Sequence, residues 1–291
     1  MKQTKAIIER AFRQYRPCLA FSGGGDSSVL LDIVASMGFK PPVIYANSQM
    51  EYPQNIDYIK GRVAAYGLEL HIAKAPVKPL DCWEKTGFPM LGKMSARVWM
   101  QRHPRSIYGI KLDVSSCCRT MKIKPARDLA KKLGCNASLT GQRGGQDDQL
   151  RGLRAKVDGA ISYVKQDNIT QINPLTGWPD AMIRRYLAGH EIPPNPLKKA
   201  GALTIGCMFC GGGAQFDNSG FRILRKTNHG AWRKMLLEYG FAEIIIAIKY
   251  DISKDLARKA LDQLGGAANV AQTMPHVFDF LKKTPLKGYT R

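Results

Sequence analysis

The 291-residue sequence lacks a long hydrophobic run and contains few histidines. No segment approaches the ~18 consecutive apolar residues that a membrane-spanning helix requires. The N-terminal residues 1–10 also lack the apolar core of a secretory signal peptide. The five histidines show no spacing typical of metal ligands. We therefore expect a cytoplasmic protein with no membrane association and no histidine-based metal centre.

Acidic residues are also scarce. The chain contains 23 Asp and Glu against 44 Lys and Arg, which gives a formal net charge of +21 at pH 7. A charge of this size attracts polyanions, because neutralising phosphates releases condensed counterions. The alternative is a basic surface that serves solubility alone. Basic residues are dense between Arg97 and Lys156, beside two of the cysteines, and this clustering favours a polyanionic substrate.

Four of the seven cysteines occur as two close pairs. Cys117 and Cys118 are adjacent, and Cys207 and Cys210 are separated by two residues. In a reducing cytoplasm, such thiols are more typical of metal ligands and buried residues than of a disulfide framework. Four thiolates suit either tetrahedral zinc or a 4Fe–4S cluster.

The other three thiols carry no such signal. Cys18 and Cys135 lie in or beside expected strands, so we expect buried structural thiols. Cys82, beside Trp83, receives no predicted role.

Hydrophobic patterning predicts alternating strands and helices in the first half of the chain. The expected strands are 18–21, 43–46, 68–73 and 137–140, and the expected helices are 1–16, 28–37, 56–66 and 127–133. This alternation is typical of a parallel sheet covered by helices on both faces. We therefore expect an α/β fold with a doubly wound, mostly parallel sheet.

Three segments depart from this alternation. Residues 76–116 are expected to form an insertion or cap, and the proline-rich residues 191–197 a turn or extended segment. From Phe221 onward, helical patterns rich in Lys and Arg predict a small helical appendage. We expect one domain over residues 1–215 and a basic helical region over residues 216–291.

A glycine-rich loop follows the first expected strand and reads Ser22-Gly23-Gly24-Gly25-Asp26-Ser27-Ser28. Glycines let backbone N–H groups converge on an anion, hydroxyls add donors, and the helix N-terminus adds partial positive charge. The loop lacks both the Gly-Lys-Ser/Thr ending of the nucleoside-triphosphate P-loop and the Gly-x-Gly-x-x-Gly of dinucleotide folds. The serines and the aspartate favour a phosphate-binding loop over a turn without a ligand.

These loop residues resemble the pyrophosphate loop of the ATP pyrophosphatase superfamily. Within it, the chain is similar to the phosphoadenosine-phosphosulfate-reductase-like family over most of its length. The segments that carry this resemblance further are 45–53, 140–147, 173–178, 195–197 and 206–210. Two positions differ from the family pattern: Asn47 stands where an aspartate is common, and Gly25 where a larger residue is frequent.

The resemblance implies that the loop binds ATP with Mg²⁺, that Asp26 and Arg143 are catalytic, and that Arg143 clamps a phosphate. It also implies that a 4Fe–4S cluster, rather than zinc, occupies the thiols, because the family's iron–sulfur members share this cysteine arrangement. The cofactor-binding residues would be Ser22, Gly23, Gly24, Gly25, Asp26, Ser27, Ser28, Asn47 and Arg143, and the metal ligands Cys117, Cys118, Cys207 and Cys210.

The expected function is that of an ATP-dependent, iron–sulfur-containing sulfurtransferase. Such an enzyme would adenylate a nucleic-acid acceptor, DNA or tRNA, and replace oxygen with sulfur, releasing AMP and pyrophosphate. The chain resembles the DNA phosphorothioation enzymes and the iron–sulfur tRNA-thiolating enzymes of the superfamily. The expected partners are the nucleic acid, a sulfur donor such as a cysteine desulfurase, and either other components of a modification system or a second copy of the chain.

Two other functions remain open. The first is an adenylyl-sulfate or phosphoadenylyl-sulfate reductase of sulfate assimilation. Those reductases share a C-terminal cysteine nucleophile and usually a degenerate loop, whereas here no cysteine follows Cys210 and the loop is intact. The second is a nucleic-acid-binding accessory subunit without turnover, against which the intact loop argues.

Overall fold

The computed structural model describes residues 1–86, 88–90, 101, 114–144, 159–202, 204–211 and 220–278. The chain packs as two compact units, each assembled from separate stretches of sequence. Unit 1 comprises residues 1–48, 52–76 and 122–199, and unit 2 comprises residues 49–51, 77–121 and 200–291. The expected boundary between residues 215 and 216 falls among residues outside the described ranges and stays a prediction.

Unit 1 is built on a six-stranded sheet with strand order β3-β2-β1-β4-β6-β5. The strands are β1 (Pro17–Ala20), β2 (Val43–Asn47), β3 (Leu70–Lys74), β4 (Ala137–Leu139), β5 (Ile161–Val164) and β6 (Ile169–Ile172). All neighbouring strands pair in parallel except β5, which pairs antiparallel with β6 at the edge. The expected doubly wound, mostly parallel α/β fold is confirmed.

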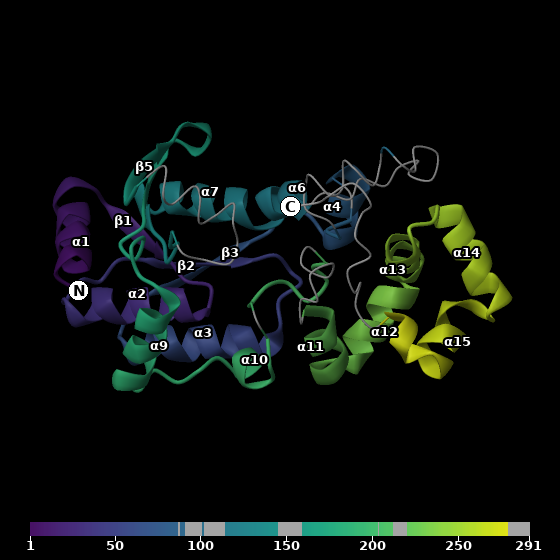
Figure 1. Ribbon diagram of the computed structural model, residues 1–291. Coiled ribbons are helices and arrows are strands. Elements are labelled where there is room, and N and C mark those ends of the chain that lie inside the picture. The colour runs from purple at the N-terminus through teal and green to yellow at the C-terminus, as the bar shows by residue number, and fades with distance from the viewer. Residues whose placement is uncertain are drawn as a thin grey trace. The chain divides into compact units, whose positions relative to one another are not determined.

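Helices cover both faces of this sheet, with α2 and α3 on one face and α7 on the other (Figure 1). The helices of unit 1 are α1 (Lys2–Gln14), α2 (Gly25–Ser36), α3 (Pro53–Ala65), α7 (Lys124–Lys132), α9 (Asp180–Gly189) and α10 (Pro196–Lys199), with a 3-10 turn, η2 (Lys165–Asp167). Helix α2 begins at Gly25, three residues earlier than the patterning predicts, because the glycine loop itself forms its first turn.

Successive residues of the central strands are buried against different helices. Leu19 of β1 and Val43 of β2 pack into the core on the α2 and α3 side. Their neighbours Cys18 and Ile44 pack into a second core with Ala130 of α7. Side chains of a strand alternate between the two faces of a sheet, so both faces must be apolar when helices cover both. This requirement explains the short, continuously apolar strands.

One carboxylate joins three helices of unit 1. Asp32 of α2 accepts hydrogen bonds from the Tyr66 hydroxyl after α3 (2.6 Å) and from the Tyr186 hydroxyl of α9 (2.7 Å). His190 Nδ1 lies 3.2 Å from the same carboxylate. Burial, followed by the hydrogen bond to Asp32, raises the pKa of both tyrosines. The two hydroxyls therefore stay protonated and act as donors.

We expect Asp32→Asn to lower the free energy of unfolding by about 1–3 kcal/mol, because the amide cannot accept both tyrosine hydrogen bonds and one polar group is left without a partner. Chemical denaturation followed by circular dichroism would measure the change. Asp57→Asn, at an exposed position of α3, is the matched control. Equal stabilities of the two variants would contradict the prediction.

Unit 2 is helical where it is described. Its helices are α4 (Pro79–Thr86), α6 (Val114–Cys118), α11 (Gly220–Thr227), α12 (His229–Leu237), α13 (Phe241–Tyr250), α14 (Lys254–Gln263) and α15 (Gly266–Thr273), with a 3-10 turn, η4 (Pro275–Phe278). A π-helical turn, η1 (Arg119–Ile123), continues α6 into α7. The C-terminal helices agree with the helical appendage expected from Phe221 onward.

The core of unit 2 is rich in aromatic rings. Trp83 of α4 packs against Phe88, Phe209, Tyr239 and Phe241, with ring centroids 5.3–6.4 Å apart. Such tilted and edge-on contacts are the preferred geometry of aromatic pairs.

Within the described ranges, no helix combines the length and the apolar character that a membrane crossing would require.

Candidate functional site

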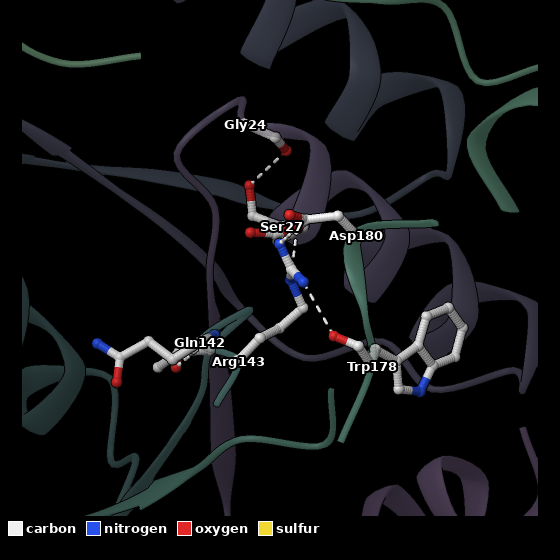
Figure 2. A network of polar contacts seen from close by, with 8 residues as sticks. Gly24, Ser27, Gln142, Arg143, Trp178 and Asp180 are labelled. Atoms are coloured by element: carbon white, nitrogen blue, oxygen red, sulfur yellow. Dashed lines mark hydrogen bonds and ion pairs between the residues drawn. The ribbon is translucent and has the colours of Figure 1, made fainter. Parts of the chain in front are cut away.

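The glycine loop connects β1 to α2 in unit 1. Gly23 has a φ of +78°, and a Cβ atom there would lie 2.4 Å from Asn55 Oδ1, so only glycine fits this position. Gly24 precedes the first helical residue, Gly25. Ser27 Oγ donates to the Gly24 carbonyl (2.9 Å), as Figure 2 shows. It also lies 3.2 Å from Ser22 Oγ. The loop is thus a tight turn that opens into a helix N-terminus, as an anion site requires.

Two buried asparagines hold the outer side of this loop. Asn195 Nδ2 donates to the Gly23 carbonyl (3.1 Å) and to Asn55 Oδ1 (2.7 Å). Asn55 Nδ2 in turn lies 3.4 Å from the Ser22 carbonyl. The two amides are 2% and 1% exposed. Amides this deeply buried are stable only when hydrogen-bonded, so they fix the backbone at the start of the loop.

Arg143 connects the loop to α9. Its Nε donates to Asp26 Oδ1 (2.9 Å), its Nη1 donates to the Trp178 carbonyl (2.9 Å), and its Nη2 donates to Asp180 Oδ1. Figure 2 shows the guanidinium near Asp180 and the Trp178 carbonyl. The Arg143 side chain is 6% exposed, whereas those of Asp26 and Asp180 are 25% and 45% exposed. The structure therefore shows Arg143 bound to protein acceptors, and its direct contact with a phosphate stays a prediction.

The segment after β4 touches the loop at Gly141. A Cβ atom on Gly141 would lie 2.9 Å from the Asp26 carbonyl carbon and 2.9 Å from the Ser27 nitrogen. Both atoms belong to the backbone, so neither can move aside cheaply. Thr140 Oγ1 donates to Asn173 Oδ1 (2.5 Å) and fixes the start of this segment. Only glycine allows the two backbones to approach this closely.

The remaining predicted nucleotide residue, Asn47, is the last residue of β2. The loop and the segment around Gly141 follow β1 and β4, which flank one another in the same sheet. The carboxyl ends of parallel strands lie together at one end of the sheet, where α/β proteins bind ligands. The structure therefore brings Ser22–Ser28, Asn47 and Arg143 to this end of the unit 1 sheet.

The thiols expected to bind metal all lie in unit 2. Cys117 is 5% exposed, and Cys118, Cys207 and Cys210 are partly exposed. Burial, followed by the charges of Cys82, Cys118 and Cys207, raises the pKa of the Cys117 thiol. Cys82 of α4, for which the sequence predicts no role, is thus a further thiol of this group and is 1% exposed.

Two polar groups adjoin these thiols. Cys207 Sγ lies 3.6 Å from Oε1 of Glu51, a carboxylate only 6% exposed. The Trp83 indole N–H is fully buried and has no partner of good hydrogen-bond geometry among the described residues. Interaction with Trp83 lowers the pKa of the Cys117 thiol, which shows that the indole N–H and this thiol are neighbours. A buried N–H without a strong acceptor, next to a thiol, suits a sulfur that becomes anionic.

Among the residues that the structure describes, no group of three or more His, Cys, Asp or Glu side chains is placed to hold a metal ion. The four cysteine ligands therefore stay a prediction. Cys18 and Cys135 are buried as expected, at 2% and 6% exposure. Interaction with the neighbouring Cys18 lowers the pKa of the Cys135 thiol.

Sequence reasoning missed two residues of the loop site. Neither Asn55 nor Asp180 was predicted, and Asn195 entered only through its family resemblance. Asn55 and Asp180 stand in the first turns of α3 and α9, where polar residues are common for local reasons. Nothing in their local sequence distinguishes a helix-terminal residue from one that contacts a distant loop.

Comparison with known proteins gives one family. A profile of the phosphoadenosine phosphosulfate reductase domain matches residues 16–212. An adenosine 5'-phosphosulfate reductase from Deinococcus radiodurans is 25% identical over 186 residues, which are 62% of this chain and 61% of that protein. A phosphoadenosine 5'-phosphosulfate reductase from Photobacterium profundum is 25% identical over 188 residues, which are 65% of each chain. The matches thus span under two thirds of the length of these relatives.

A solved structure shares the fold. The crystal structure of phosphoadenylyl-sulfate reductase from Candida auris, a phosphate complex, superposes with a TM-score of 0.50 at 22% identity. The superposition covers 70% of this chain and 88% of that chain. At this identity, the similarity shows the fold alone.

The expected nucleic-acid sulfurtransferase is wrong. The relatives bear the names of adenylyl-sulfate and phosphoadenylyl-sulfate reductases, which is the alternative that the sequence analysis left open. The error has two physical sources. A net charge describes the whole surface and does not identify one substrate, and a loop that binds phosphate fits a sulfonucleotide as well as ATP.

Proposed function

The chain belongs to the phosphoadenosine phosphosulfate reductase domain family, and we propose that it is a sulfonucleotide reductase. Its substrate would be adenylyl sulfate or the 3'-phosphorylated form of that nucleotide, and its products would be sulfite and the corresponding adenosine phosphate. The observation that carries this proposal is the extent of the family match. Residues 16–212 include the glycine loop, Arg143 and all four paired cysteines.

The loop of unit 1 supplies the binding half of this function. The backbone N–H groups at the start of α2 lie at a helix N-terminus, which favours an anion, and the hydroxyls of Ser22 and Ser27 lie beside them, 3.2 Å apart. Asn55 and Asn195 hold the loop in this shape without ligand. Preorganised donors bind an anion without having to reorder first. We propose that the phosphate of the sulfonucleotide occupies this position.

The paired cysteines of unit 2 supply a donor set for iron. Thiolates are the ligands of 4Fe–4S clusters, and Cys117, Cys118 and Cys207 lie close enough to influence one another electrostatically. The buried Trp83 N–H offers a hydrogen bond to the Cys117 sulfur. These features fit the group, and we propose that Cys117, Cys118, Cys207 and Cys210 hold such a cluster. When bound, it would supply positive iron and a site for electron transfer or substrate polarisation.

The reaction needs two electrons, because sulfur passes from the sulfate to the sulfite oxidation state. A thiolate attacks the sulfur, the S–O bond to the nucleotide breaks, and the adenosine phosphate leaves. The product of this attack is an S-sulfo thiol, R–S–SO3−. A second thiolate then attacks its thiol-derived sulfur, the S–S bond breaks, sulfite leaves and a disulfide forms. We propose that an external dithiol supplies the two thiols and hence both electrons.

The test is sulfite release by anaerobically purified protein. With dithiothreitol or a reduced thioredoxin as the dithiol, we expect adenylyl sulfate or its 3'-phosphorylated form to yield equal amounts of sulfite and adenosine phosphate. Omitting the nucleotide or the dithiol should abolish sulfite release. A parallel reaction with ATP and Mg²⁺ monitors pyrophosphate. Pyrophosphate release from ATP with no sulfite from either sulfonucleotide would contradict the proposal.

A further inference from the structure

The positive charge that the loop site needs does not come from Arg143 as the structure stands. Its Nε, Nη1 and Nη2 are bonded to Asp26, the Trp178 carbonyl and Asp180, respectively. Two carboxylates surround one guanidinium, so the group as a whole carries one negative charge. A phosphate brought to the loop would meet this charge, and another cation must offset it.

Residues 195–198 form a short segment that contacts the glycine loop, and this segment contains Lys198. Asn195 binds the Gly23 carbonyl through its amide nitrogen, and its Oδ1 accepts from the Leu197 backbone N–H (2.9 Å). The Asn195 carbonyl accepts from the Lys198 N–H (2.9 Å). One buried side chain thus fixes both the loop and the turn in which Lys198 stands. These bonds fix the backbone of Lys198 relative to the loop.

The charge of Lys198 acts on the loop. Burial lowers the pKa of Lys198, and the carboxylate of Asp26 opposes this shift. Asp26 is the second residue of α2, so the lysine lies within electrostatic range of the helix N-terminus where an anion would bind. Lys198 and its neighbour Lys199, the last two residues of α10, are both exposed. Adjacent helical residues point in directions about 100° apart, so the two lysines differ in direction.

We propose that Lys198 is the residue that pairs with the nucleotide phosphate at the glycine loop. This proposal depends on the proposed function only because it requires the glycine loop to bind an adenosine phosphate. Lysine suits this role because its ammonium is a compact charge on a flexible stem and can follow a phosphate from one side. The role of Arg143 is then to hold Asp26 and the loop in place, while Lys198 meets the ligand.

The experiment is equilibrium binding of AMP, adenylyl sulfate and adenosine to the full-length protein and three variants. We expect Lys198→Ala to weaken AMP and adenylyl sulfate binding by about 10-fold to 100-fold, the range for a hydrogen bond between charged groups. Adenosine, which lacks a phosphate, should bind equally well to wild type and variant. Lys198→Arg should restore most of the affinity, and Lys199→Ala should leave all three affinities unchanged.

Salt dependence gives a readout that a purely structural role would not move. Raising the salt concentration should weaken AMP binding to the wild type and to Lys199→Ala by the same factor. For Lys198→Ala, the salt effect should be smaller, because one ion contact is missing. Lys198→Gln, which removes the charge but keeps part of the apolar stem, serves if the alanine variant unfolds.

Three results would overturn the inference. The first is equal AMP affinity of Lys198→Ala and Lys199→Ala. The second is an equal loss of adenosine and AMP binding in Lys198→Ala, which would assign the effect to the shape of the site. The third is a wild type that binds none of the three ligands, which would end the proposed function as well. In the first two cases, sulfite release by the wild type shows that the proposed function stands.

Discussion

Replacing Gly141 with alanine is expected to lower the affinity for adenylyl sulfate by about 10-fold to 100-fold, the cost of losing a hydrogen bond to a charged group. The new methyl carbon would lie 2.9 Å from backbone atoms of Asp26 and Ser27. Neither atom can rotate away, so the loop or the segment after β4 must shift. Either shift moves the N–H donors that the anion needs. Equilibrium binding of adenylyl sulfate measures the loss.

Gly177→Ala is the matched control for this substitution. A Cβ atom at Gly177 has open space around it, with no heavy atom within 4 Å, and this glycine belongs to the same unit. We expect the Gly177→Ala protein to bind adenylyl sulfate as tightly as the wild type. Both variants should show the circular dichroism spectrum of the native protein. A Gly141→Ala protein that binds adenylyl sulfate as tightly as Gly177→Ala would show that the two backbones need not touch for the loop to work.

Replacing Cys118 with alanine is expected to abolish the binding of iron and, with it, sulfite release. Anaerobically reconstituted wild type should hold about four iron atoms per chain, as a 4Fe–4S cluster requires. The variant should lack the visible absorption of the cluster. Binding of adenylyl sulfate should persist, because the glycine loop belongs to unit 1 and Cys118 to unit 2. Iron and sulfide analysis, together with the binding measurement, separates the two effects.

Cys82→Ala is the control for the cysteine substitution. Cys82 is a buried thiol of the same group, and its charge acts on Cys117, yet it lies outside the two pairs that the family resemblance assigns as ligands. We expect this variant to keep its iron. Loss of iron from Cys82→Ala with retention in Cys118→Ala would replace the assigned ligand set. A wild type without iron after reconstitution would remove the cluster from the proposal.

The parallel part of the fold was predictable because its strands are apolar on both faces. Leu19 and Cys18, or Val43 and Ile44, pack on opposite sides, so each strand appears as a short apolar run between turn residues. Strands β5 and β6 were missed for the opposite reason. Strand β5 is an edge strand whose Tyr163 is 59% exposed, and β6 contains Gln171, whose amide donates to Gln142 Oε1 (2.8 Å). Their polar residues hide the strand pattern.

The glycine loop was predictable because all its essential features are contiguous. The residues that shape it were not, because they come from distant parts of the chain. Asn195 and Gly23 are 172 positions apart, and Arg143 and Asp26 are 117 positions apart. A single sequence suggests a phosphate contact for a conspicuous arginine in a glycine-rich segment. Only the folded chain shows that neighbouring carboxylates already engage its donors.

The interleaving of the two units sets an order on biosynthesis. Unit 2 takes residues 77–121 from the middle of the chain and residues 200–291 from its end. The thiols at 117 and 118 therefore emerge from the ribosome long before those at 207 and 210. Throughout that interval the nascent polypeptide carries two exposed, oxidisable sulfurs without their later neighbours. The proposed cluster could therefore be inserted only after Cys210 has emerged, and its yield should depend on how reducing the cell is during synthesis.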